Sequence, residues 1–111
     1  MTYDDVAAQA RAFRDERDWA QFHNPKDLAL SISLEASELL EGFQWSGADL
    51  DVPDKRERMA EELADVMIYC ALFADAAGID AVEAMARKLE ANARKYPVDK
   101  ARGSAAKYTE L

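Results

Sequence analysis

The chain has 111 residues, enough for one domain with a core but few for a monomer that must also hold a polar site. Half of the residues are hydrophobic and only four glycines and three prolines are present, a composition typical of a helical protein without a sheet. The formal net charge of -8, from 22 acids against 14 bases, argues against a nucleic-acid backbone as the main partner, because that affinity comes from basic patches.

The first two predicted helices span residues 2–18 and 25–44. In the first, Tyr3 and Val6 begin an apolar face at helical spacing, which continues through Ala10 and Phe13. The second begins where Asn24 suits an N-cap and Pro25 suits the first helical position, and it ends before a turn at residues 45–47.

The second and third predicted helices both carry acids where hydrophobic residues are expected. The apolar stripe of the second helix consists of Leu28, Ile32, Leu39 and Phe43. Glu35 falls in the middle of that stripe and Glu38 follows one turn later. The third helix, residues 54–77, has its own stripe of Met59, Val66 and Phe73. Glu62 falls inside that stripe and Asp65 lies on its edge, so the same anomaly occurs twice.

These four acids predict a metal site. An unpaired carboxylate in an apolar environment is costly enough to take up a proton or to bind a cation. The i, i+3 spacing points both carboxylates of each pair from one helix face, so two neighbouring helices can share one cation. An all-oxygen site suits Mg²⁺, with Mn²⁺ as a possibility, whereas zinc would call for cysteine or histidine at ligand spacing. The alternative is that these acids are simply solvated, as single acid pairs on amphipathic helices usually are.

The fourth predicted helix spans residues 80–96 and follows a short link. Gly78 supplies the left-handed residue that ends the third helix, and Asp80 with Glu83 forms a variant of the capping box. The short link predicts antiparallel packing of the third and fourth helices. The inner face of the fourth helix consists of Val82, Ala86, Leu89 and Ala93, flanked by Lys88, Asn92 and Lys95. Pro97 ends the helix, and residues 97–111 are expected to form an irregular tail.

The chain is therefore expected to be a single all-α domain over residues 1–111, built as a four-helix bundle. Cys70, the only cysteine, cannot form an intrachain disulfide and is expected to be a buried free thiol in a reducing cytoplasm. The chain shows no signal peptide and no apolar run of membrane-spanning length, so we expect no membrane association.

Several motifs resemble a known family. The acid signature reads Glu35, Glu38, a gap of 23 residues, then Glu62 and Asp65. The flanking blocks are Arg17-Asp18-Trp19, Gln21-Phe22-His23, Glu41-x-Phe43-Gln44-Trp45, Asp65-Val-x-Ile68-Tyr69, Lys95-Tyr96-Pro97 and Lys107-Tyr-Thr-Glu-Leu111. Together they resemble the all-α nucleoside triphosphate pyrophosphohydrolases of the MazG type, in the dCTP pyrophosphatase branch, over nearly the whole chain.

This resemblance implies Mg²⁺-dependent hydrolysis of a nucleoside triphosphate, preferably dCTP, to a monophosphate and pyrophosphate, with the four acids as metal ligands and catalytic residues. It also implies that Trp19 and Trp45 stack on the base and that the bundle is completed as a homodimer or homotetramer. Further candidates for substrate contacts are His23, Tyr69, Lys88, Asn92, Lys95 and Arg102. A structural role competes for each: core packing for the aromatic residues, a cap for His23 and a solvated face for the bases.

Two departures from the family pattern affect the details. Leu34 stands where many MazG proteins have an additional glutamate, and the loop at residues 47–53 is short for the dCTP branch. Base preference is thus less firmly implied than the reaction, and a broad MazG-type or dUTP hydrolase is an alternative. A non-catalytic helical scaffold that binds Mg²⁺ for stability is the alternative from another class.

Overall fold

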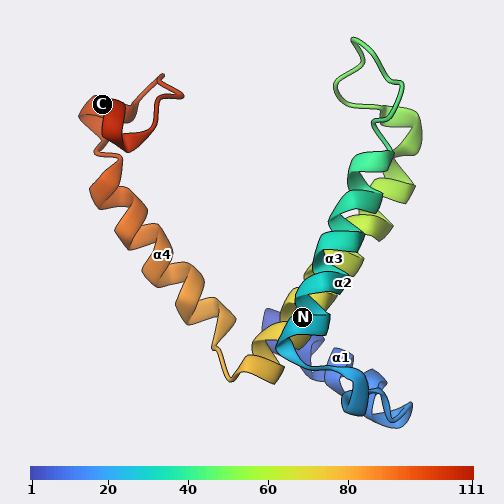
Figure 1. Cartoon of the computed structure of the whole chain (residues 1–111). Coiled ribbons are helices and arrows are strands. Elements are labelled where there is room, and N and C mark those ends of the chain that lie inside the picture. The colour runs from blue at the N-terminus through green and yellow to red at the C-terminus, as the bar shows by residue number, and fades with distance from the viewer. The chain divides into compact units, whose positions relative to one another are not determined.

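The computed structural model describes all residues, 1–111, and contains helices and turns but no β-strand (Figure 1). The all-α class predicted from composition is confirmed. The chain divides into two compact units, residues 1–79 and 80–111, and each is described by itself. The predicted single domain and the predicted packing of the third helix against the fourth therefore stay predictions.

The first unit is built on a helical hairpin. Helices α2 (Pro25–Glu41) and α3 (Arg56–Ala77) run antiparallel and are in contact along the pair, and α1 (Tyr3–Glu16) packs against α3 (Figure 1). Single 3₁₀ turns precede α2 at Trp19–Phe22 and α3 at Pro53–Lys55. This hairpin brings the two predicted acid pairs onto neighbouring helices.

The predicted helix boundaries at three caps are confirmed. The Asn24 side chain accepts a hydrogen bond of 2.9 Å from the Asp27 backbone amide, with Pro25 next in the chain. Gly78 ends α3 at φ 68°, a left-handed conformation that costs glycine little. Asp80 accepts a hydrogen bond of 3.0 Å from the Glu83 amide at the start of the next helix.

The segment between α2 and α3 differs from the prediction, because α2 ends at Glu41 and not near residue 44. The chain passes through a series of turns, in which the Asp49 carboxylate accepts hydrogen bonds from the amides of Asp51 at 3.2 Å and Val52 at 3.0 Å. Val52 is buried there. Lys55 donates a hydrogen bond of 3.3 Å back to the Gly42 carbonyl. These contacts satisfy backbone groups locally, so the hairpin closes without extending the helix.

The buried core is small. The buried hydrophobic residues are Ala7, Leu28, Val52, Leu72 and Ala74, and of these only Leu28 is fully buried. Large hydrophobic side chains remain exposed on α2 and α3, namely Leu30, Leu34, Leu40, Leu63, Met67 and Ile68. Cys70 is free and exposed, so the expectation of a buried thiol is wrong. The reason is that α1 and α2 cover only part of the circumference of α3, and Cys70 lies on the rest.

The second unit contains helix α4 (Ala81–Lys95) and an ordered tail. The tail forms α5 (Val98–Ala101) and a 3₁₀ turn at Tyr108–Glu110, so the expected irregular tail is wrong for these segments. Aromatic contacts explain the order, because the rings of Tyr96 and Tyr108 meet edge to face at 6.0 Å. No helix of the structure combines the length and the apolar character that crossing a membrane requires.

Candidate active site

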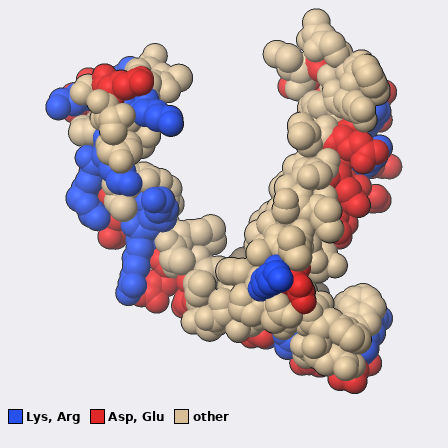
Figure 2. Space-filling view, in the orientation of Figure 1, with Lys and Arg blue, Asp and Glu red and all other residues tan.

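Carboxylates from α2 and α3 converge where the two helices pack together. One oxygen each of Glu35, Glu62 and Asp65 lies within 4.8 Å of the others. Glu38 is outside this set of three, but its carboxyl group is close enough to Glu35 and to Glu62 to share a proton with either. The two acid pairs predicted from the sequence thus form one acid cluster. Figure 2 shows acidic side chains gathered along one flank of the hairpin.

The environment of the acid cluster favours the protonated forms of its half-buried members. Desolvation raises the pKa of Glu35, and hydrogen bonding to Glu38 and repulsion from the other acids raise that pKa further. Desolvation likewise raises the pKa of Glu62, together with its interaction with Glu38, while the charge of Arg58 lowers it. In the absence of a cation, the protein therefore holds protons on these groups more tightly than an unfolded chain would.

Two oxygen atoms show that the acid cluster fits a metal ion. The Oε2 atoms of Glu35 and Glu62 are buried and have no hydrogen-bond partner. A buried polar atom without a partner is costly, and a cation between the helices would remove that cost for both oxygens. All donors are carboxylates, which hard divalent cations prefer over sulfur or imidazole. The acid cluster can therefore hold a metal ion of this class.

Arg58 is the one basic residue that an ion pair joins to the acid cluster. Its Nε lies 3.9 Å from Glu62 Oε1, and its Nη2 lies 3.7 Å from Glu41 Oε1 on the facing helix. Arg58 was not among the residues predicted from the sequence. The i, i+4 spacing of Arg58 and Glu62 could have indicated it, but the contact with Glu41 depends on the pairing of the two helices.

A cavity of about 360 Å³ opens beside the acid cluster, between α1, the turn at Trp19–Phe22 and α3. It brings together three predicted substrate residues, Trp19, His23 and Tyr69, next to Asp65. His23 Nδ1 is buried and has no hydrogen-bond partner, so it is available to a ligand. Most of the remaining lining is apolar, which suits a flat aromatic group.

Phe13 and Arg14, which were not predicted as site residues, also line this cavity. The rings of Phe13 and Trp19 meet edge to face at 5.8 Å, and the Arg17 guanidinium lies 3.5 Å from the centre of the Phe13 ring. Asp18, at φ 55°, turns the chain so that Trp19 follows closely on α1. Phe13 lies on the apolar face of α1, so its position predicted core packing and gave no signal of a ligand pocket.

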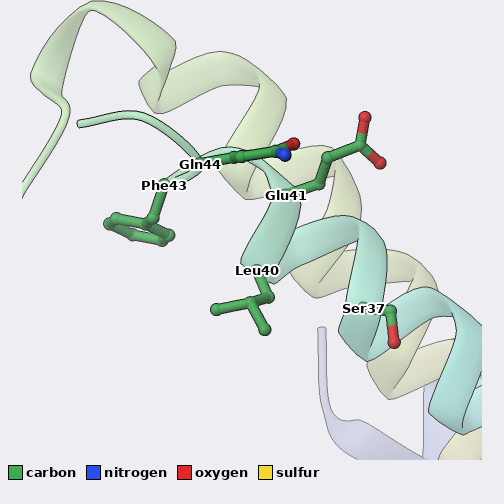
Figure 3. A pocket seen from close by; sticks show the side chains of 5 residues that line it. All are labelled: Ser37, Leu40, Glu41, Phe43 and Gln44. Carbon is green, nitrogen blue, oxygen red and sulfur yellow. The ribbon is translucent and has the colours of Figure 1, made fainter. Parts of the chain in front are cut away.

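Trp45 is not in this cavity. It lies in the turns after α2, at φ 67°, and is 92% exposed. An open hollow of about 480 Å³ precedes it on the chain and is lined by Ser37, Leu40, Glu41, Phe43 and Gln44 (Figure 3). In Figure 3, Leu40 and Phe43 project to one side and Glu41 to the other. The stacking role of Trp45 stays a prediction.

The remaining predicted substrate residues belong to the second unit. Lys88, Asn92 and Lys95 lie on α4, and Arg102 directly follows α5. Lys95 Nζ lies 4.9 Å from the centre of the Tyr108 ring, which limits the range of that side chain. Because each unit is described by itself, the roles of these four residues also stay predictions.

Comparison with known proteins identifies the family. A family model described as the MazG-like family matches residues 30–111, well over half of the chain. This chain belongs to the MazG-like family. The dCTP pyrophosphatase 1 proteins of Homo sapiens and Bos taurus are each 40% identical to the MazG-like chain over 115 residues, covering 99% of it and 68% of their own length.

A solved structure agrees with this assignment. The crystal structure of a pyrophosphatase from Archaeoglobus fulgidus is 46% identical to the MazG-like chain, with a TM-score of 0.77 over 85% of this chain and 91% of that one. The fold and the pyrophosphohydrolase family predicted from the acid signature are confirmed. The acid cluster offers carboxylates that could hold a metal ion.

The raised pKa of Glu62 predicts how metal-free stability depends on pH. Its contribution to stability is fully present below about pH 4.3, the ordinary pKa of glutamate, and is lost as the pH rises through the raised value in the folded protein. Glutamine does not ionise, so Glu62→Gln does not lose this stability as the pH rises. In urea unfolding with a chelator present, we expect the free energy of unfolding of the variant to gain on wild type as the pH rises.

Glu61→Gln is the matched control, because Glu61 is an exposed neighbour outside the acid cluster. The difference in free energy of unfolding between Glu61→Gln and wild type should not increase with pH in this way. Adding Mg²⁺ should stabilise wild type more than Glu62→Gln at neutral pH. A difference between Glu62→Gln and wild type that stays flat with pH would contradict the assignment.

Proposed function

We propose that this protein hydrolyses dCTP to dCMP and pyrophosphate and requires Mg²⁺. The observation that carries the proposal is the acid cluster, with buried partnerless oxygens on Glu35 and Glu62, next to an aromatic-walled cavity. The names of the mammalian relatives, dCTP pyrophosphatase 1, support cytosine as the base. Cleansing of the nucleotide pool in the cytoplasm would be the corresponding role.

In this proposal Glu35, Glu38, Glu62 and Asp65 hold the metal ion. Bound there, Mg²⁺, or Mn²⁺ in its place, would screen phosphate charge and lower the pKa of a bound water. The water oxygen forms a bond to the α-phosphorus while the bond from that phosphorus to the bridging oxygen breaks, and pyrophosphate leaves with the electron pair. The proton of the water passes to a carboxylate of the acid cluster that the metal ion does not fully engage.

The cavity beside Asp65 is proposed to bind the base and the sugar. The Trp19 ring meets Phe13 edge to face and offers a surface on which a pyrimidine can stack. Stacking of a base on an aromatic ring contributes about 1–3 kcal/mol to binding. His23 can hydrogen-bond to the base or the sugar through its unpaired Nδ1. Tyr69 lies one turn after Asp65 and lines the same cavity, where its hydroxyl can contact a sugar or phosphate oxygen.

The remaining predicted contacts are proposed to join the site through assembly of a homodimer or homotetramer. Exposed apolar residues lie one turn apart on α2, at Leu30 and Leu34, and on α3, at Leu63 and Met67. Such rows are the usual mark of a protein interface. A second copy could bring Trp45 and the four polar residues of the second unit, Lys88, Asn92, Lys95 and Arg102, to the nucleotide.

The assembly is tested by sedimentation equilibrium of the whole chain. We expect a dimer or a tetramer, because covering the exposed rows would enlarge a small core. Leu34→Glu should shift the distribution toward monomer, whereas Glu90→Gln on α4 should not. Wild type that sediments only as a monomer at micromolar concentration would contradict the assembly.

The reaction is tested by separating the products formed from dCTP, dUTP and dATP with Mg²⁺. We expect dCTP to be cleaved fastest, to dCMP and pyrophosphate. Glu38→Ala should lower kcat by about 10²-fold or more, because outer-shell groups of metal sites alone are worth 10–100-fold. Glu61→Gln should retain wild-type rates. Phosphate as the product would contradict the proposed bond, and unchanged hydrolysis by Glu38→Ala would favour the scaffold alternative.

The base pocket is tested at Trp19. Trp19→Ala removes the stacking wall and should raise KM for dCTP by about tenfold to a hundredfold, with a smaller change in kcat, because the loss is mainly in binding. Trp19→Phe keeps an aromatic face and should recover most of the affinity. Equal KM values for wild type and Trp19→Ala would exclude stacking at this position.

A further inference from the structure

Arg58 and the aromatic cavity lie on opposite sides of the acid cluster along α3. The cavity uses Asp65, Ile68, Tyr69 and Leu72, all at or beyond the C-terminal end of the cluster. Arg58 lies one turn before Glu62, on the other side. At 1.5 Å per residue, Arg58 is about 10 Å along the helix from Asp65, in the direction away from the cavity.

The guanidinium of Arg58 is close to two acids without being committed to either. Its ion pairs to Glu41 and Glu62 have N···O distances of 3.7 and 3.9 Å, too long for hydrogen bonds, and its side chain is 46% exposed. The structure contains no hydrogen bond from this side chain. A guanidinium has five N–H donors in a planar fork that matches phosphate oxygens, so Arg58 has its donors free for a ligand.

Two other basic residues of the first unit, in contrast, already have hydrogen-bond partners. Lys55 is hydrogen-bonded to the Gly42 carbonyl, and Arg14 donates a hydrogen bond of 2.7 Å to Asp75, which is outside the acid cluster. A triphosphate brought to four carboxylates needs positive charge for its distal phosphates as well as for the bond that breaks. Arg58 is placed to supply it, because it is the basic residue that an ion pair joins to the acid cluster.

We propose that Arg58 binds the β- and γ-phosphates of the substrate and holds them as the pyrophosphate leaves. The inference rests on the proposed function: the base occupies the cavity, the bond to be broken lies at the acid cluster, and the rest of the triphosphate continues toward Arg58. Before substrate binds, the ion pairs with Glu41 and Glu62 keep the Arg58 guanidinium near the N-terminal end of the acid cluster on α3. Figure 3 shows Glu41 directed away from the hydrophobic Leu40 and Phe43.

The test measures binding of pyrophosphate and of dCMP, each with Mg²⁺, by calorimetry on the whole protein. Arg58→Gln should weaken pyrophosphate binding by about tenfold or more, the effect of losing hydrogen bonds to a charged group. Its affinity for dCMP should stay at the wild-type level. Arg58→Lys keeps the charge without the fork and should recover part of the loss. In turnover, Arg58→Gln should lower kcat/KM for dCTP.

Glu41→Gln separates this role from a structural one. If Arg58 only ties α3 to α2, then Glu41→Gln and Arg58→Gln should have equal effects, and dCMP binding should fall with pyrophosphate binding. If Arg58 binds phosphate, Glu41→Gln should leave pyrophosphate binding intact or strengthen it. Wild type that cleaves dCTP while Arg58→Gln binds pyrophosphate equally well overturns this inference alone. Wild type that cleaves no nucleotide overturns the proposed function as well.

Discussion

Two glutamate oxygens buried between α2 and α3 without hydrogen-bond partners are the constraint on which the rest of the structure depends. A sequence that needed only stability would place hydrophobic residues there, because an uncompensated buried carboxylate is costly. The antiparallel hairpin instead brings Glu35 and Glu62 together, and the turns anchored by Asp49 and Val52 hold the two helices in register. The folded chain carries this cost where a cation can remove it.

The aromatic cavity is also built on α3, the helix that carries Glu62 and Asp65. Residues of α3 that face the acids are one turn from residues that face α1, so the acid cluster and the cavity share Asp65 as a common edge. Arg14, which lines the cavity, also joins α1 to α3 through its contact with Asp75. A pocket of this kind needs little core around it, and the first unit has little.

Neither unit has a large core. Exposed hydrophobic side chains remain on the hairpin, and the apolar face of α4 finds no partner within residues 80–111. The tail nevertheless orders α4 locally, because Tyr108 contacts both Tyr96 and Lys95. The second unit therefore presents polar residues without a core of its own, which is consistent with the proposed assembly.

The sequence by itself determined the helices, their caps and the two acid pairs, because helical periodicity and the capping chemistry of Asn24, Gly78 and Asp80 depend only on near neighbours in the chain. Family resemblance predicted Trp19 as a substrate contact, and the place of Tyr69 one turn after Asp65 predicted Tyr69 as another; both residues line the cavity. Only the tertiary structure decided that Phe13 lines the cavity, that Arg58 reaches Glu41 and that Cys70 is exposed. These features depend on which faces of separate helices meet, and a periodic pattern marks a face as apolar without saying what covers it.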